Sequence, residues 1–247
     1  MSAWIRNFHP APRAGVRLFC FPHAGGAASA YFPFSAALSG EVEVLTFQYP
    51  GRQDRLAEPP PADLDSLVEA CLAELSPYTA EPFAIFGHSM GAVIGYEVAR
   101  RLESAGRARP AALFVSGRQA PSLPWPPEGL VPEDGPDDDW VIGEARRLGG
   151  VDPALLDEPE LRRLTLPALR ADLRAIFAHT HRPGPRLTCP LTALTGDRDP
   201  SVTVAGARAW HSETTGPFDL HVFPGGHFYL NDQLPEVTKL IATSLPE

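Results

Sequence analysis

Residues 82–102, PFAIFGHSMGAVIGYEVARRL, join an apolar run to a helix-like run through the turn GHSMG at residues 87–91. The run Pro82–Gly87 is nearly continuously apolar, as expected for a strand that is covered on both faces of its sheet. The segment Met90–Ser104 has the apolar spacing of a helix. The glycines of the turn allow a bend tight enough to raise Ser89 above the end of the strand. These residues predict a strand–turn–helix unit with a hydroxyl at its bend.

More apolar runs alternate with helix-like segments along the rest of the chain. The runs read as strands at Val16–Phe21, Val42–Phe47, Ala112–Gly117, Pro190–Gly196 and Phe218–Phe223. The helix-like segments cover about Asp63–Leu75, Ser201–Glu213 and Leu234–Ser244. Strands that alternate with helices typically form a mostly parallel sheet with helices on both faces. The sequence therefore predicts an α/β fold.

One stretch interrupts this alternation. Residues 120–136, APSLPWPPEGLVPEDGP, are rich in proline, and helical spacing follows at Trp140–Leu148 and Glu158–Ala178 before the next strand. A long helical insertion between two strands of a sheet is typical of a lid over a site. We expect a single domain over residues 1–247 with a lid subdomain inserted at about 120–185. The alternative is a small helical domain that only packs against the rest.

Ser89 needs a base, because a serine hydroxyl is a poor nucleophile at neutral pH. The chain has 8 histidines, and His227 lies in PGGHFYL, directly after the Phe218–Phe223 run and before the last helix-like segment. An α/β-hydrolase places its base there, and its chain order is Ser, acid, His. His227 is therefore the predicted base for Ser89.

The carboxylate that orients this imidazole is expected in TGDRDP, residues 195–200. This turn offers Asp197 and Asp199. In α/β-hydrolases the acid usually stands three residues after a glycine that ends the strand, which favours Asp199. Asp197 remains the alternative because it lies on the same turn.

The loop FPHAGG, residues 21–26, is similar to the HGG-type loop that donates one N–H group to an oxyanion hole. The second N–H group comes from the residue after the nucleophile. We therefore assign the oxyanion hole to the backbone N–H groups of Ala24 and Met90, with Gly25 as the alternative to Ala24. His23 is expected to brace this loop rather than to act in catalysis.

Composition excludes several classes of function. The net charge of −9 argues against general nucleic-acid binding. No apolar run is long enough to span a membrane, and the N-terminal residues lack the apolar core of a secretory signal. Cys20, Cys71 and Cys189 are far apart, which favours buried, reduced thiols in a cytoplasmic protein. His179 and His181 lack an evident third ligand, so we expect no metal site.

The motifs FPHAGG, QYPGRQDR, FGHSMGA, LPALRADL, TGDRDP and PGGHFYL, in this order, closely resemble the type II thioesterases. These are the free-standing editing enzymes of polyketide synthases and nonribosomal peptide synthetases. The resemblance runs from about Arg17 to Leu230. YPGR and LRAD are its most specific motifs. The chain departs from relatives after LRADL, where they often carry a glutamate and tyrosines and this chain has IFAHTH at residues 176–181.

The resemblance implies the α/β-hydrolase fold and the hydrolysis of short, stalled or wrong acyl groups from the phosphopantetheine arm of carrier proteins. It carries over Ser89, Asp199 and His227 as a catalytic triad, and it implies no metal or cofactor. The expected partners are acyl or peptidyl carrier domains, with no nucleic acid and no membrane. We expect the enzyme to be a monomer.

Two points stay open at this level. The same triad serves a general carboxylesterase or a thioesterase that releases or cyclises a product, and a non-catalytic protein that docks on a synthase would share the fold. Because the chain and carrier proteins are both acidic, docking would need a local basic patch. The candidates are lid arginines, namely Arg162, Arg163, Arg170 and Arg174.

Overall fold

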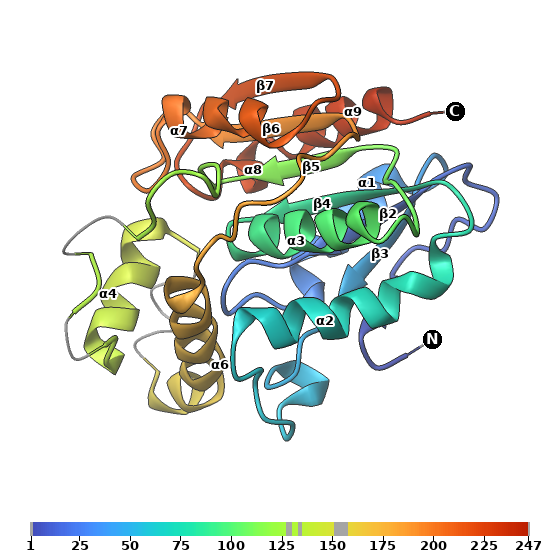
Figure 1. The fold of residues 1–247 in the computed structure, drawn as a ribbon. Helices are drawn as coiled ribbons and strands as arrows, with labels where there is room; N and C mark the ends of the chain where they lie inside the picture. The colour runs from blue at the N-terminus through green and yellow to red at the C-terminus, as the bar shows by residue number, and fades with distance from the viewer. Residues whose placement is uncertain (1, 127–129, 133–134, 151–157, 247) are drawn as a thin grey trace.

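The computed structural model describes residues 2–126, 130–132, 135–150 and 158–246. These residues contain a 7-stranded sheet in the order β1-β3-β2-β4-β5-β6-β7 (Figure 1). The strands are β1 (Ile5–Arg6), β2 (Arg17–Phe21), β3 (Glu43–Phe47), β4 (Phe83–His88), β5 (Leu113–Ser116), β6 (Leu191–Gly196) and β7 (Phe218–Phe223). β1 is antiparallel to β3, and all other neighbours are parallel. The mostly parallel sheet predicted from the sequence is confirmed, and β1 is an addition to it.

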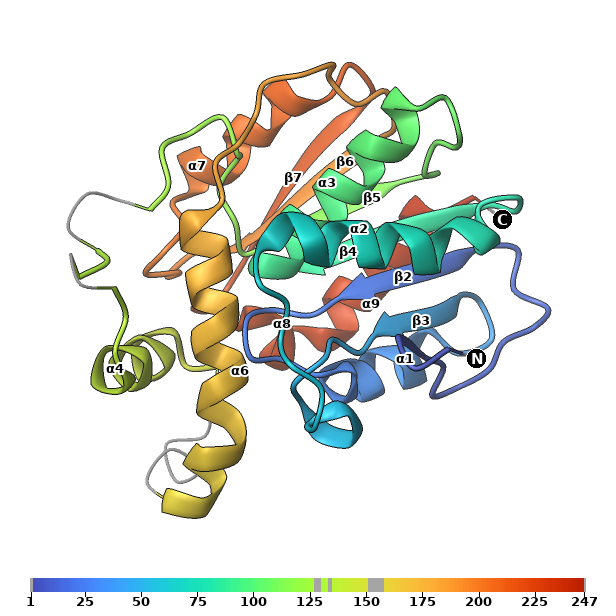
Figure 2. The same cartoon turned by 60° about the horizontal axis from the view of Figure 1, so that its bottom comes forward.

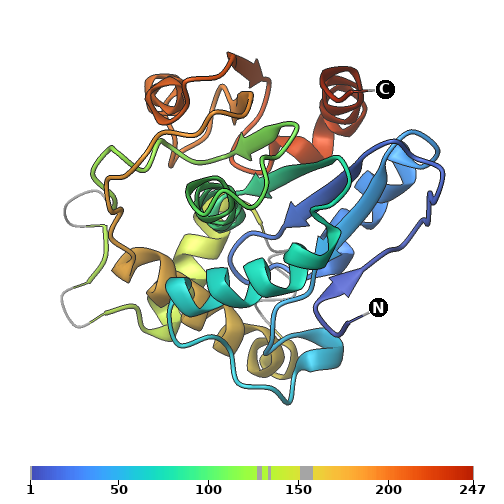
Figure 3. The same ribbon diagram turned by 45° about the vertical axis from the view of Figure 1, so that its right-hand side comes forward.

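Helices cover both faces of this sheet. They are α1 (Phe32–Leu38), α2 (Leu64–Leu75), α3 (Met90–Ser104), α7 (Val204–Arg208), α8 (Tyr229–Asp232) and α9 (Leu234–Ser244). Figure 3 shows α2 and α3, in teal and green, on one side of the sheet, and α1 and α9, in blue and red, on the other. Alternate residues of one strand therefore enter different cores. Phe19 and Phe21 of β2 pack with α2 and α3, whereas Leu18 packs with α1 and α9.

The single helix predicted over Ser201–Glu213 is wrong at its start. The α-helix begins at Val204, capped by Thr203, and a 3-10 turn follows at Ala209–Glu213. The N–H groups of Ser201 and Val202 instead bind the side chain of Asp199. This side chain competes with the helix for the backbone donors, as aspartate does in turns.

The insertion between β5 and β6 holds the helices α4 (Asp138–Leu148) and α6 (Pro159–Ala178). They lie side by side at one end of the sheet (Figure 2). Their shared core consists of Val141, Ile142, Ala145, Leu166, Leu169 and Leu173. The parts of the expected lid at 127–129, 133–134 and 151–157 lie outside the described residues. None of the helices within the described ranges is long and apolar enough to cross a membrane.

Candidate active site

Ser89 stands at the bend between β4 and α3 with φ 56° and ψ −115°. A positive φ is rare for residues other than glycine, so the bend is strained. A Cβ atom on Gly87 would lie 2.1 Å from the carbonyl oxygen of Gly91, and one on Gly91 would lie 1.9 Å from that of Phe21. The glycines are therefore required because backbone occupies the space of a side chain. The Ser89 N–H group donates to Ser116 O at 2.8 Å and ties the bend to β5.

His227 is bound by a carboxylate. Its Nδ1 lies 2.8 Å from Asp199 Oδ2, and both side chains are buried. Asp199 Oδ1 accepts hydrogen bonds from the N–H groups of Ser201 and Val202, at 2.8 and 3.2 Å. Asp197 points elsewhere, since its Oδ1 accepts a bond from the Gly225 N–H group. The structure thus places Asp199, not Asp197, on the imidazole.

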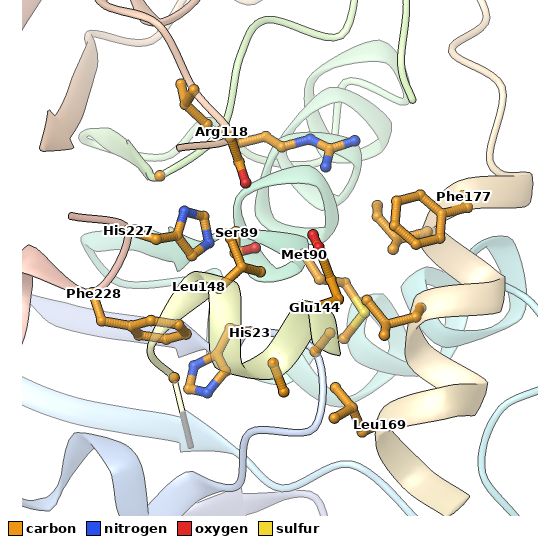
Figure 4. A pocket seen from close by; sticks show the side chains of 18 of the residues that line it. His23, Ser89, Met90, Arg118, Glu144, Leu148, Leu169, Phe177, His227 and Phe228 are labelled. Carbon is orange, nitrogen blue, oxygen red and sulfur yellow. The ribbon is translucent and has the colours of Figure 1, made fainter. Parts of the chain in front are cut away.

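Ser89 and His227 line the same small cavity, of about 60 Å³. Figure 4 shows the His227 ring beside Ser89. His227 Nε2 is buried and has no hydrogen-bond partner among the described residues. With Nδ1 engaged by Asp199, Nε2 is the ring nitrogen left to exchange a proton with Ser89. The rest of the wall is largely apolar and comes from α4, α6 and neighbouring loops, including Leu148, Leu169, Leu173, Ile176, Phe177, Val202 and Phe228.

Ala24 and Met90 line this cavity as well. Met90 is the first residue of α3, so its N–H group has no partner in a preceding helical turn. The Gly25 N–H group, the alternative donor, is bound to Asp172 Oδ2 at 2.8 Å. The Gly25 N–H group is thus already hydrogen-bonded. The N–H groups of Ala24 and Met90 remain the expected oxyanion donors, and both residues line the cavity beside Ser89.

A buried ion pair joins the Ala24 loop to the lid. Arg52 donates to Asp172 Oδ2 at 2.7 Å and to Oδ1 at 3.0 Å, and the two side chains are 5% and 2% exposed. Arg52 also donates to the carbonyl oxygen of Gly26 at 3.0 Å. The motifs YPGR and LRAD have no role at the sequence level. In the structure they contact each other through Arg52 and Asp172. We call this arrangement of Arg52, Asp172, Gly25 and Gly26 the lid clamp.

Two further histidines lie near His227. Burial is the main cause that lowers the pKa of His88 well below its usual value, and it lowers the pKa of His23 to about 4, with the charge of His227 adding to both shifts. Both rings are therefore neutral at neutral pH. His88 Nδ1 bonds to Ser116 Oγ at 2.9 Å, and Ser116 Oγ bonds to the Tyr229 hydroxyl at 2.7 Å.

His23 packs on Phe228 with ring centroids 4.8 Å apart, and its carbonyl oxygen accepts the Gly26 N–H group. Cys20, Cys71 and Cys189 are buried, free thiols. Within the described ranges, no group of three or more His, Cys, Asp or Glu side chains is placed to hold a metal ion.

Comparisons with known proteins agree on one family. The family model described as "Thioesterase domain" matches residues 16–245. Thioesterase PikA5 of Streptomyces venezuelae is 49% identical over 243 residues, which cover 98% of this chain and 85% of that protein. The structure of BorB, a type II thioesterase from the borrelidin biosynthetic cluster, is 45% identical with a TM-score of 0.90, covering 99% of this chain and 98% of BorB.

The RedJ thioesterase from the prodiginine pathway of Streptomyces coelicolor is 39% identical, with a TM-score of 0.86 over 96% of this chain and 88% of RedJ. The likeness therefore spans the sheet, the Ser89 bend and the insertion together. The chain belongs to the thioesterase domain family, and it is a hydrolase of thioesters with the α/β-hydrolase fold that the sequence predicted.

Proposed function

We propose that this thioesterase removes short, stalled or wrong acyl groups from the phosphopantetheine arm of carrier proteins in a polyketide or nonribosomal peptide synthase. The observation that carries the proposal is the 2.8 Å contact of Asp199 with His227, whose free nitrogen borders the cavity of Ser89. The origin of BorB in a biosynthetic cluster supports the carrier-bound substrate. The partner is an acyl or peptidyl carrier domain.

In the first half of the reaction, His227 Nε2 takes the Ser89 proton as the hydroxyl oxygen attacks the thioester carbonyl carbon. The N–H groups of Ala24 and Met90 stabilise the negative charge that develops on the carbonyl oxygen by donating hydrogen bonds to it. Asp199 holds the proton-bearing Nδ1 and stabilises the imidazolium. The carbon–sulfur bond then breaks, and His227 returns the proton to the departing thiol.

In the second half, His227 takes a proton from a water molecule, which attacks the acyl-serine ester. The second tetrahedral intermediate collapses to the free acid and Ser89 regains its proton from His227. Every proton moves through one imidazole, and the proposal requires no metal or cofactor.

The small volume of the Ser89 cavity supports short acyl groups. It measures about 60 Å³, well below the roughly 150 Å³ of a cavity that holds benzene. Its lid wall is apolar, which suits a hydrocarbon chain.

The test is an incubation of the enzyme with acetyl-, propionyl- and longer acyl-carrier proteins, followed by intact mass. We expect loss of the acyl mass with the wild type, fastest for short chains, and no loss above background with Ser89→Ala. Retention of full activity by Ser89→Ala would contradict the mechanism. A p-nitrophenyl ester assayed in parallel addresses the alternatives. An esterase would prefer that ester, and a cyclising enzyme would release a ring rather than an acid.

A further inference from the structure

Two larger cavities adjoin the small cavity of Ser89. The first, which we call the Arg118 groove, has a volume of about 600 Å³ and lies between α3, the loop after β5 and the segment after α6. It shares Arg118, Trp125 and Phe177 with the Ser89 cavity, so the two cavities lie next to each other at these side chains. The second cavity, of about 630 Å³, meets the Ser89 cavity on the opposite side, at His23 and Ala24.

Arg118 is a largely buried cation on the wall that the two cavities share. It is 9% exposed, and among the described residues no hydrogen bond or ion pair reaches its guanidinium group. The guanidinium lies over the Trp125 ring, whose centroid is 3.9 Å from Arg118 Cζ. Figure 4 shows the side chain extending over Ser89 and Met90. None of its side-chain nitrogens is among the described atoms that are both fully buried and unbonded, so these donors face the two cavities and can reach an acceptor that comes with the substrate.

Burial lowers the pKa of Arg118 to about 9. The group still carries its proton at neutral pH, because that value lies above 7. It is therefore a charged donor on the wall of a largely apolar cavity, which Glu144 also lines. A charged donor forms a stronger hydrogen bond with a neutral carbonyl than a neutral donor does.

The Arg118 groove has a mixed polarity that suits a thiol arm that carries amides. It follows α3 from Val93 to Tyr96, and Tyr96 is seven residues beyond Ser89, or roughly 10 Å at the rise of an α-helix. Its walls mix apolar rings with polar side chains such as Gln119, His179 and His181. The second cavity is mostly apolar, with Pro33, Phe34, Leu169, Leu230 and Leu234 on its walls.

The groove also begins on the side where the thiol departs. A Cβ atom on Gly117 would lie 2.5 Å from His88 Cε1 and 3.3 Å from His227 Cε1, so Arg118 follows directly after a residue that packs beside both rings. In the proposed reaction the imidazole of His227 protonates the leaving sulfur. A thiol arm that leaves past His227 therefore meets Arg118 next.

We infer that the Arg118 groove binds the pantetheine arm, and that Arg118 donates to the carbonyl oxygen of the amide nearest the sulfur. The inference rests on the proposed function, since it assumes a thioester of an amide-bearing thiol. In the arm, two methylene groups separate the sulfur from this amide. Arg118 is then a specificity residue that distinguishes pantetheine-type thiols from simple alkyl thiols.

The test compares three propionyl thioesters: those of N-acetylcysteamine, which keeps the first amide, of pantetheine, and of a pentyl thiol without amides. For Arg118→Met we expect kcat/KM to fall about tenfold to a hundredfold on both amide-bearing substrates, the range for one hydrogen bond from a charged group. On the pentyl thioester the change should stay within about threefold. Arg118→Lys keeps the charge and should recover part of the loss.

Arg182→Met is the matched control. Arg182 lies on the segment after α6 that forms one side of the groove, but its own side chain is 84% exposed. This variant should behave as the wild type on all three substrates. The melting temperature of Arg118→Met should not fall, since removing an unpaired buried charge does not cost folding free energy. An activity loss can then be assigned to binding.

Equal losses on the amide-bearing and pentyl thioesters would overturn the inference, as would no loss on any of them. A loss that appears only with the pantetheine thioester, with the N-acetylcysteamine thioester unaffected, would overturn it too, because Arg118 would then bind beyond the first amide. Failure of the proposed function looks different: the wild type would hydrolyse these small thioesters but would leave the acyl groups on carrier proteins.

Discussion

At the scale of single residues, the choice between Asp199 and Asp197 depends on where two carboxylates of one turn point. Asp199 Oδ2 contacts His227, whereas Asp197 holds the Gly225 N–H group. We expect Asp199→Asn to lower kcat by about 10⁴-fold, because an amide favours the wrong imidazole tautomer. Asp197→Asn should stay within about tenfold. Steady-state hydrolysis of an N-acetylcysteamine thioester by both variants decides this, and similar losses would contradict the assignment.

The bend at Ser89 leads to a second prediction at this scale. We expect Gly91→Ala to destabilise the fold by at least about 3 kcal/mol, because its Cβ atom would lie 1.9 Å from the Phe21 carbonyl oxygen. Gly143→Ala in α4 is the matched control, since a Cβ atom there meets nothing within 4 Å. That change should stabilise the protein by up to about 1 kcal/mol. Urea unfolding measures both, and equal stabilities would disprove the steric argument.

At the scale of elements, the lid clamp couples α6 to the loop that carries Ala24. Arg52 and Asp172 are 120 positions apart and form a bidentate pair that also holds Gly25 and Gly26. Fixing this loop fixes where the Ala24 N–H group points. The clamp therefore connects the position of α6 with the geometry of the oxyanion site. Movement of the lid that keeps the clamp intact would involve α4 more than α6.

We expect Asp172→Asn to cost about 3–5 kcal/mol of stability, because it leaves the Arg52 charge buried and unpaired. The value of kcat should also fall, since the Gly25 N–H group loses a charged acceptor. The double variant Arg52→Met/Asp172→Leu should regain much of the stability but little of the kcat. Urea unfolding and thioester hydrolysis separate the two effects. A double variant with wild-type kcat would show that the clamp serves stability alone.

At the scale of the whole molecule, the loss of folding stability at acidic pH depends on His23 and His88. The pKa of His23 is lowered to about 4, and that of His88 is lowered well below its usual value. As the pH falls below about 6.5, the unfolded chain binds protons that the folded protein rejects. Stability therefore decreases from about pH 6.5 towards pH 4, and His23 alone accounts for up to about 3 kcal/mol.

Urea unfolding at a series of pH values tests this expectation. The free energy of unfolding of the wild type should fall between pH 7 and pH 5, and His88→Gln should show a shallower decrease because glutamine does not titrate. Parallel curves for the two proteins would exclude His88 as a contributor.

The basic patch on the lid also belongs to the whole molecule, whose net charge is −9. Arg162 and Arg163 lie at the surface of α6, where Arg163 forms an exposed pair with Glu160, and Arg170 is paired with Asp138 nearer the lid core. We expect Arg162→Glu and Arg163→Glu to raise KM for acyl-carrier protein several-fold and to leave a small thioester unaffected. Arg170→Glu should affect the lid itself. Unchanged KM values for the first two variants would place docking elsewhere.

The order of strands and helices and the bend at Ser89 could be predicted because both have local causes. Apolar periodicity identified β2 to β7 to within one or two residues, and the helices α3 and α9 begin and end as predicted. Weak local signals were missed. β1 has only two residues, α8 has four, and α1 is a short helix that begins with FPF. Elements this short are held by contacts with the sheet rather than by their own periodicity.

The sequence alone determined the fold class and named Ser89, His227 and a pair of candidate acids, because residue spacing and turn glycines act over a few positions. Only the tertiary structure decided which acid contacts His227 and that the Gly25 N–H group donates a hydrogen bond to Asp172. It alone also showed that Arg118 has no hydrogen-bond or ion-pair partner among the described residues. These facts depend on which side chains meet after the sheet and the insertion pack together. Contacts between distant positions leave no periodic pattern in one sequence.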